Sequence, residues 1–296
     1  MLVELPRNGT YVVAVSGGVD SIVLLNLLAK LNQENKKYKF IVAHLDHGIR
    51  EDSNLDKVLV ENQAKRLNLP FVYYRANLGS DASEDQARQA RYDFLNKIKV
   101  ASSARAIITA HHNDDLIETA LINLTRGTNR KGLTSLLNNK MVIRPLINYR
   151  KEELIKYAKD NQIIWREDIT NQDTKYLRNY IRQFITPKIN NTARTQLITL
   201  LNRLASINRE IDDLIEQSLN QQKNKGSLDR FWFSHLPHNV AKEIFAGWLR
   251  ANNIRNFDSS TLERLVIAGK VGSSGQKFPV QKDKYLKVYK DHLALE

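Results

Sequence analysis

The chain contains no cysteine among its 296 residues, and it has only two methionines and six prolines. Without cysteine it can form no disulfide, thiolate zinc site or iron–sulfur cluster, and it has no cysteine nucleophile. No apolar run approaches the ~18 to 20 residues that a membrane-spanning helix needs. The first residues include an acid, Glu4, and no long apolar segment, so no signal peptide is predicted. We therefore expect a cytoplasmic protein with no membrane partner.

Acidic side chains are in deficit. The sequence has 45 Lys and Arg against 32 Asp and Glu, which gives a formal net charge of +13. Such an excess favours polyanionic partners such as nucleic acid, because binding releases counterions from the polyanion. The chain is also rich in Lys, Asn and Ile, as the product of an A/T-biased genome would be, so the charge alone leaves both explanations open.

The first half of the chain alternates short apolar runs with amphipathic ones, which predicts an α/β domain with a doubly wound parallel sheet. Strands are expected at 11–15, 40–44, 71–75, 106–110 and 141–145, and helices at 22–31, 55–67, 83–98, 116–124 and 151–161.

The alternation stops near Pro187. Residues 187–222 are polar with apolar residues at helical spacing, which predicts a helical linker. Residues 223–296 then predict a small α+β domain, with helices around 240–251 and 260–268 and strands near 277–280, 285–289 and 292–295. The catalytic domain is accordingly expected to span residues 1–186.

A glycine-rich turn stands between the first expected strand and the first expected helix. It reads Ser-Gly-Gly-Val-Asp-Ser over residues 16–21. A strand–turn–helix of this kind aims backbone N–H groups and the positive end of the helix dipole at one point, where a phosphate would lie. The glycines allow an anion to approach the backbone, and no lysine follows them as in a Walker A loop. The alternative is an ordinary turn capped by Asp20 or Ser21.

A second polar segment, residues 111–119, follows the strand expected at 106–110 and opens the next helix. If that helix starts early enough, His111, Asp115 and Glu118 share one face. Carboxylates beside a triphosphate are natural ligands for Mg²⁺. Because parallel strands present their carboxyl ends at one edge, this segment and the glycine-rich turn are expected to lie together. Capping by Asn113 or Asp114 would explain the segment without chemistry.

Residues 44–50 follow the second expected strand and include two histidines and an arginine. Their position suits contact with a nucleotide, and a plain loop explains them equally well. Arg88 and Arg91 lie one turn apart on the helix at 83–98, where solvated helix charges would suffice. The stretch 125–132 is expected to be a mobile basic loop that closes over pyrophosphate or RNA, or lies free at the surface.

Near the end of the first domain, Arg178 and Arg182 are four residues apart, so a regular helix would present both on one face to phosphates. Tyr180 and Phe184 have the same spacing, and we expect them to pack in the core.

Together these segments resemble the tRNA(Ile)-lysidine synthetase family of PP-loop ATP pyrophosphatases. The runs at 86–92 and 171–179 are the discriminating ones, because a generic PP-loop enzyme has the glycine-rich turn without them. Thr170 stands where the family usually has serine, and longer members carry a further C-terminal domain. The resemblance implies an adenine nucleotide alpha hydrolase-like fold.

The resemblance also implies a reaction. Such an enzyme adenylates C2 of cytidine 34 in the CAU anticodon of tRNA(Ile), and free L-lysine then displaces AMP to form lysidine, with pyrophosphate released earlier. The tRNA thereby changes from methionine to isoleucine specificity. The alternatives are an ammonia-using PP-loop synthetase or another PP-loop tRNA-modifying enzyme, and the sequence makes no prediction of oligomeric state.

The family's functional positions correspond to residues of this chain in four groups. The implied catalytic residues are Asp20, His111, Asp115, Glu118 and Arg178. The implied ATP-binding residues are Ala14, Ser16, Gly17, Gly18, Val19, Asp20, Ser21, His44 and Ala110. Mg²⁺ would bind Asp20, Asp115 and Glu118. The implied tRNA-binding residues are Arg88, Arg91, Arg126, Arg130, Lys131, Arg182, Lys282 and Lys284.

Overall fold

The computed structural model describes residues 1–35, 37–48, 53–79, 82–138, 141–167, 177–222, 226–254 and 257–296. Thr170 and most of the discriminating run at 171–179 lie outside the described residues, as does the end of the 44–50 segment. The chain forms two compact units, Met1–Ala205 and Ser206–Glu296.

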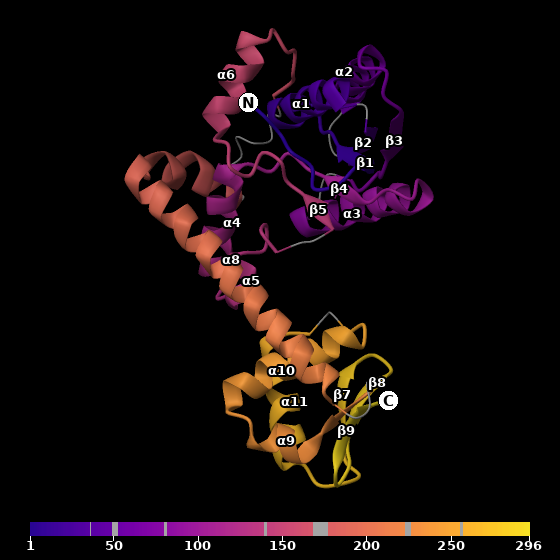
Figure 1. Cartoon of the computed structure of the whole chain (residues 1–296), viewed down its shortest axis with the longest axis vertical. Helices are drawn as coiled ribbons and strands as arrows, with labels where there is room; N and C mark the ends of the chain where they lie inside the picture. The colour runs from indigo at the N-terminus through magenta and orange to yellow at the C-terminus, as the bar shows by residue number, and fades with distance from the viewer. Residues whose placement is uncertain are drawn as a thin grey trace. The chain divides into compact units, whose positions relative to one another are not determined.

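The first unit is built on a parallel sheet of five strands in the order β3-β2-β1-β4-β5 (Figure 1). The bounds are β1 Gly9–Ala14, β2 Tyr38–Asp46, β3 Phe71–Arg75, β4 Ala106–Ile108 and β5 Val142–Ile143. β1 is central and pairs in parallel with both β2 and β4. The predicted doubly wound parallel sheet is confirmed.

Helices cover both faces of this sheet, which is why the central strands are apolar without alternation. The helices are α1 Val19–Asn35, α2 Ser53–Arg66, α3 Glu84–Ala101, α4 Asn113–Thr125 and α6 Lys151–Asp160. Val13 packs in one core with α1, α2 and α6, whereas its neighbour Val12 packs with Phe94 and Leu95 of α3 on the other face. Figure 1 shows α3 across the sheet from α1.

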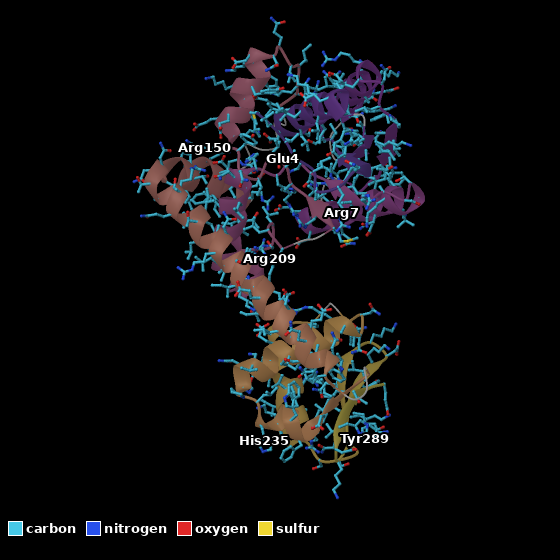
Figure 2. All side chains as sticks on the ribbon, viewed as in Figure 1. Glu4, Arg7, Arg150, Arg209, His235 and Tyr289 are labelled. Atoms are coloured by element: carbon cyan, nitrogen blue, oxygen red, sulfur yellow. The ribbon has the colours of Figure 1, made fainter. Side chains whose placement is uncertain are left out.

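The second unit combines three helices, α9 Arg230–His235, α10 His238–Ala251 and α11 Ser259–Val271, with an antiparallel sheet in the order β6-β9-β8-β7. Its strands are β6 Ser227–Asp229, β7 Lys277–Gln281, β8 Lys284–Val288 and β9 His292–Leu295. Phe233, Phe245 and Trp248 form an aromatic core that the helices share. Figure 2 marks His235 at the end of α9 and Tyr289 after β8. The small α+β domain is confirmed, although β6 and α9 are too short to show a period in the sequence.

A single helix, α8 Asn191–Asn220, contains the division between the units. Its first turns belong to the first unit, because Leu201 packs with Leu116 and Leu136 and Arg194 pairs with Asp114. The first unit therefore extends past residue 186, the predicted end of the catalytic domain. Apolar spacing along a helix does not reveal which core the helix packs against.

Several short elements also differ from the sequence expectation. The stretch 125–132 is not wholly a loop, because α5 spans Arg130–Leu133. Arg178 lies in the short helix α7 Leu177–Tyr180, which continues into the π-helical turn η2 Ile181–Ile185 and the 3-10 turn η3 Thr186–Lys188. Tyr180 and Phe184 contact each other and are half exposed, so their expected core packing is wrong. Within the described ranges, no helix has the length and apolarity needed to cross a membrane.

Candidate functional site

The glycine-rich turn, residues 16–21, folds around the hydroxyl group of Ser21. That oxygen accepts from the amide N–H groups of Ser16 and Gly17 at 3.1 and 3.2 Å, and it donates to the carbonyl oxygen of Gly18 at 2.9 Å. The first bond of α1 runs from Ile22 N–H to Gly18 O. The amides of residues 19–21 precede that bond and face the helix N-terminus, where they can bind an anion. The Gly17 amide is bonded to Ser21, and the contact of Gly17 with ATP stays a prediction.

An ion pair between Arg166 and the buried Asp56 lies against the glycine-rich turn. Arg166 donates its backbone N–H to Gly17 O at 3.1 Å, and its Nε lies 2.9 Å from Oδ1 of the buried Asp56 in α2. Gly17 has φ +99°, and a Cβ there would lie 3.4 Å from the Cβ of Asp56. Sequence reasoning missed Asp56 and Arg166, because ordinary helix and loop charges carry no motif.

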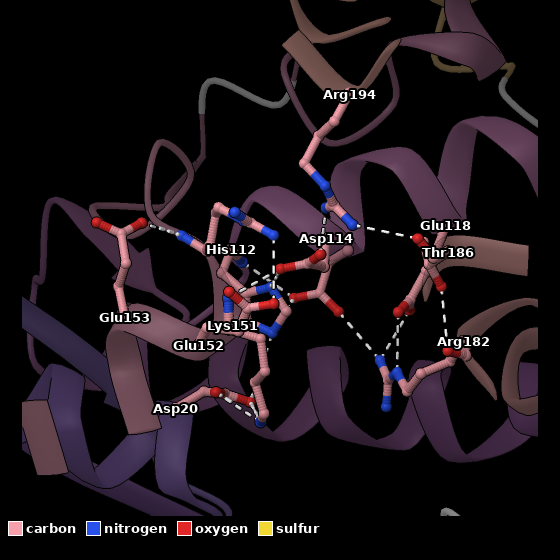
Figure 3. A network of polar contacts seen from close by, with 12 residues as sticks. Asp20, His112, Asp114, Glu118, Lys151, Glu152, Glu153, Arg182, Thr186 and Arg194 are labelled. Atoms are coloured by element: carbon pink, nitrogen blue, oxygen red, sulfur yellow. Dashed lines mark hydrogen bonds and ion pairs between the residues drawn. The ribbon is translucent and has the colours of Figure 1, made fainter. Parts of the chain in front are cut away.

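The acidic residues at the start of α4 meet Asp20 of α1 around one histidine, His112 (Figure 3). His112 Nε2 lies 3.7 Å from Asp20 Oδ2 and 3.5 Å from Asp115 Oδ2. The residue as a whole is 3% exposed. Burial alone would lower the pKa of His112, but the carboxylates of Asp115 and Asp20 outweigh it, so this pKa is raised above its ordinary value. The glycine-rich turn and the α4 acids are thus joined, as the sequence predicted.

Lys151, the first residue of α6, neutralises Asp20. Its Nζ lies 2.7 Å from both carboxylate oxygens of Asp20. Burial would raise the pKa of Asp20, but contacts with His112 and Lys151 prevail and lower it. Lys151 is a residue that sequence reasoning missed, since it stands alone at the start of an amphipathic helix.

Glu118 is 1% exposed and pairs with Arg182 of η2 (Figure 3). Arg182 Nε lies 2.9 Å from Oε1 and Nη2 lies 2.8 Å from Oε2, a two-point contact, and Nη2 also lies 3.3 Å from Asp115 Oδ1. Burial raises the pKa of Glu118 despite this cation. Arg182, expected to bind tRNA, is therefore engaged by two acids of α4.

Asp114 joins three segments that are far apart in sequence. Its carboxylate accepts the backbone N–H of Lys151 at 2.8 Å and pairs with Arg194 of α8. Asp114 thus fixes the starts of α4 and α6 to the first part of α8. Its predicted alternative role as the helix cap is not observed, since the N-cap is His112.

The histidine that meets the acids is His112 rather than the predicted His111. Because α4 begins at Asn113, residue 111 precedes the helix and does not share its face. His111 Nδ1 instead lies 2.8 Å from the hydroxyl of Thr109. Burial lowers the pKa of His111 to about 4, so the ring is neutral at pH 7.

The three predicted Mg²⁺ ligands do not fit a resident metal site. Lys151 covers Asp20, and Arg182 covers Glu118 and one oxygen of Asp115. The other Asp115 oxygen accepts the backbone N–H of His112 at 3.0 Å. No cluster of three or more acids and histidines suited to a metal ion occurs among the residues that the structure describes.

Three of the predicted ATP-binding residues, Ala14, His44 and Ala110, lie at or after the ends of β1, β2 and β4. His44 is buried, its Nδ1 donates to Val15 O at 2.8 Å, and its ring stacks on Tyr73. Burial lowers the pKa of His44, which keeps the ring neutral. Ala14 ends β1 and Ala110 follows β4, both half-buried beside the turn.

Comparisons with known proteins show which family the chain belongs to. The PP-loop domain family matches residues 2–189. The tRNA(Ile)-lysidine synthase of Mycoplasma mycoides is 32% identical over 284 residues, which cover 91% of this chain and 70% of that relative. The chain belongs to the tRNA(Ile)-lysidine synthase family. The resemblance drawn from the sequence is confirmed.

Other members of the lysidine synthase family are longer than this chain. The enzyme of Thermosipho africanus is 38% identical over 235 residues, covering 77% of this chain and 50% of the relative. That of Lactiplantibacillus plantarum is 32% identical over 276 residues, covering 88% and 60%. The chain thus spans about half to seven tenths of these relatives.

Among solved structures, the U34-tRNA thiolase NcsA from Methanococcus maripaludis superposes with a TM-score of 0.59. It is 17% identical and is covered over 74% of its chain, with 68% of this chain. The likeness supports the PP-loop fold of the lysidine synthase family and carries no further argument.

Apart from Arg182, the cations expected to bind tRNA fall in three places in this lysidine synthase family member. Arg88 and Arg91 lie on α3, where Arg88 stacks over the Tyr92 ring at 5.1 Å and Arg91 Nη2 lies 3.4 Å from His47 Nε2. Arg126 caps α4, and Arg130 and Lys131 lie in α5. Lys282 and Lys284 belong to the β7–β8 hairpin of the second unit. Their contacts with tRNA remain predictions.

Arg178 and Arg182 do not act as one phosphate clamp in this structure. Arg178 Nε lies 3.4 Å from Glu84 of α3, whereas Arg182 is bound to Glu118. The two arginines are therefore held by acids of two different helices, Glu84 of α3 and Glu118 of α4.

Substitution of the two glycines of the turn is predicted to have different effects, on stability for Gly17 and on ATP binding for Gly18. Gly17→Ala forces a positive φ on alanine, and we expect a loss of about 1–2 kcal/mol in the free energy of unfolding. A Cβ at Gly18 would meet only Ser16 Oγ, at 3.6 Å, so Gly18→Ala should leave the melting temperature unchanged. If phosphate approaches the turn at Gly18, that variant weakens ATP binding about tenfold. Thermal denaturation and calorimetric titration with ATP measure both effects; wild-type ATP affinity in both variants would contradict the assignment.

Arg182→Met is predicted to destabilise the protein more at pH 7.5 than at pH 5. It leaves Glu118 buried without its cation, at a cost of about 1–3 kcal/mol in the free energy of unfolding near neutral pH. The folded-state pKa of Glu118 is already raised and rises further, so its contribution to stability is largest below the unfolded pKa and is lost as pH rises.

The control is the double variant Glu118→Gln/Arg182→Met, in which residue 118 carries no charge that needs Arg182. Urea unfolding at both pH values should show most of the stability restored at pH 7.5. An equal loss at both pH values, or no recovery in the double variant, would mean that the loss of stability does not come from the unpaired carboxylate of Glu118.

Proposed function

We propose that the chain ligates free L-lysine to C2 of cytidine 34 in the CAU anticodon of tRNA(Ile), using ATP and releasing AMP and pyrophosphate. The modified tRNA would read isoleucine rather than methionine codons. The membership of the chain in the lysidine synthase family supports this activity, and we propose that the reaction takes place in the cytoplasm. The +13 net charge suits a polyanionic substrate.

One observation carries the proposal: the anion-binding N-terminus of α1 and the acids of α4 meet through a single contact set. Asp20 lies in the turn, His112 bridges it to Asp115, and Glu118 follows one turn later. This brings a phosphate site and potential proton acceptors to the same edge of the sheet, where parallel sheets bind ligands. Adenylation needs the phosphate site, and ligation needs a proton acceptor close to it.

In the first step, the oxygen on C2 of cytidine attacks the α-phosphorus of ATP, and the bond to the bridging oxygen of pyrophosphate breaks. The amides of residues 19–21 would hold the leaving pyrophosphate, and the dipole of α1 favours its charge. Mg²⁺ enters with ATP as part of the substrate. Lys151, 2.7 Å from Asp20, supplies a fixed cation beside the same turn.

In the second step, the lysine side-chain amine attacks C2, and the bond from C2 to the AMP oxygen breaks. The amine has a pKa of about 10.4, so freeing its lone pair at pH 7 costs about 4–5 kcal/mol. A carboxylate must accept the proton, and Asp115 and Glu118 are the candidates. Burial raises the pKa of Glu118, which suits a proton acceptor.

Radiolabelled lysine provides the direct test. The purified protein, incubated with ATP-Mg²⁺, labelled lysine and tRNA(Ile) bearing CAU, should put stable label into the RNA. Methionine tRNA with the same anticodon is the matched control and should stay unlabelled. Equal labelling of both tRNAs would refute the stated specificity, and ATP cleavage with ammonia but no label in RNA would instead indicate an ammonia-using synthetase.

Asp115→Asn should abolish lysine transfer, by about 10³-fold or more, and leave tRNA affinity within about twofold. Asparagine keeps an oxygen that accepts the His112 N–H, so the start of α4 is preserved, which alanine would not ensure. Single-turnover labelling and filter binding measure the two quantities. A parallel loss of tRNA affinity and melting temperature would contradict a chemical role.

A further inference from the structure

Arg144 is a buried arginine that no described acid neutralises. It directly follows β5 and is 9% exposed. Its Nη1 donates to Val142 O at 3.3 Å, and its Nε is buried without a partner. No carboxylate of the described ranges lies within ion-pair distance of it.

Burial and a neighbouring cation both disfavour the charge on Arg144. Burial lowers the pKa of Arg144, Tyr92 opposes this shift, and the positive charge of Arg88 on α3 adds to it. Burial lowers the pKa of His111, and the charges of Arg144, Arg91 and Arg88 add to that shift. The three arginines therefore act electrostatically on the same histidine.

This arrangement is unfavourable by itself. Removing a cation from water costs several kcal/mol unless an anion accompanies it, and like charges nearby add to the cost. Elsewhere in this unit the buried charges are matched, as Glu118 is by Arg182 and Asp114 by Arg194. The contrast indicates that the partner of Arg144 is an anion from outside the chain, and a guanidinium fork suits phosphate oxygens.

The position separates this anion from the nucleotide site. The glycine-rich turn follows β1, whereas Arg144 follows β5, two strands away in the order β1-β4-β5. Neighbouring strands are about 4.8 Å apart, so the two strand ends are about 10 Å apart. That separation leaves room for a second phosphate beside the one at the N-terminus of α1.

We propose that Arg144, with Arg88 and Arg91, forms a phosphate subsite for the RNA backbone next to the cytidine that is modified. The assignment of RNA rests on the proposed function. Arg144 was absent from the predicted tRNA-binding residues, because one arginine in a strand-like run carries no motif.

The test uses Arg144→Met, which keeps the length of the side chain and removes its charge, and Arg144→Lys, which keeps the charge. Arg66→Met, at the exposed end of α2, is the matched control. Filter binding of the tRNA(Ile) transcript from 50 to 200 mM salt gives the affinity and its salt dependence. Melting temperature and the KM for ATP are measured on the same proteins.

We expect Arg144→Met to weaken tRNA binding about tenfold and to reduce the slope of log affinity against log salt by about 0.7–0.9, as one lost phosphate contact does. Arg144→Lys should keep that slope, and Arg66→Met should match the wild type. The melting temperature of Arg144→Met should be unchanged or higher, because an unmatched buried charge is removed.

A lower melting temperature with unchanged tRNA binding would show a structural role and overturn the proposal. A raised KM for ATP with unchanged tRNA binding would assign the phosphate to the nucleotide and overturn the RNA source. If the wild type transfers no lysine while the salt slope still changes, the proposed function fails and the phosphate subsite stands.

Discussion

Charge neutralisation around the start of α4 is the constraint on which the first unit depends. Four acids, Asp20, Asp114, Asp115 and Glu118, lie close together at the edge of the sheet and would repel one another if unmatched. Cations from three later segments neutralise them: Lys151 from α6, Arg182 from η2 and Arg194 from α8. The same contacts that allow the acids to be buried also fasten those segments to the sheet.

These pairs give the site its chemical character. Each acid is held by a named cation or backbone N–H, so a substrate that enters must compete with fixed protein groups for the carboxylates. Asp115 and Glu118 already bind the guanidinium of Arg182, so few of their oxygens remain for a metal ion, which needs several.

Anion binding, in contrast, depends on N–H groups and positive charge that no described acid matches. At α1, the hydroxyl of Ser21 ties back two amides and leaves those of residues 19–21 directed outward. At β5, Arg144 keeps a charge that no described acid matches. One edge of the sheet therefore combines a saturated acidic centre with two places that lack negative charge, and a substrate with several phosphates complements both.

The sequence by itself determined the parallel sheet, the phosphate turn and the meeting of Asp20 with the acids of α4. Apolar runs of fixed period and a glycine-rich turn are local properties, and parallel strands bring their carboxyl ends to one edge whatever follows. Only the tertiary structure decided the partners of those acids, because Lys151 and Arg182 come from distant segments with no motif. It also decided that His112 and not its neighbour joins the site, since that depends on the residue at which α4 begins.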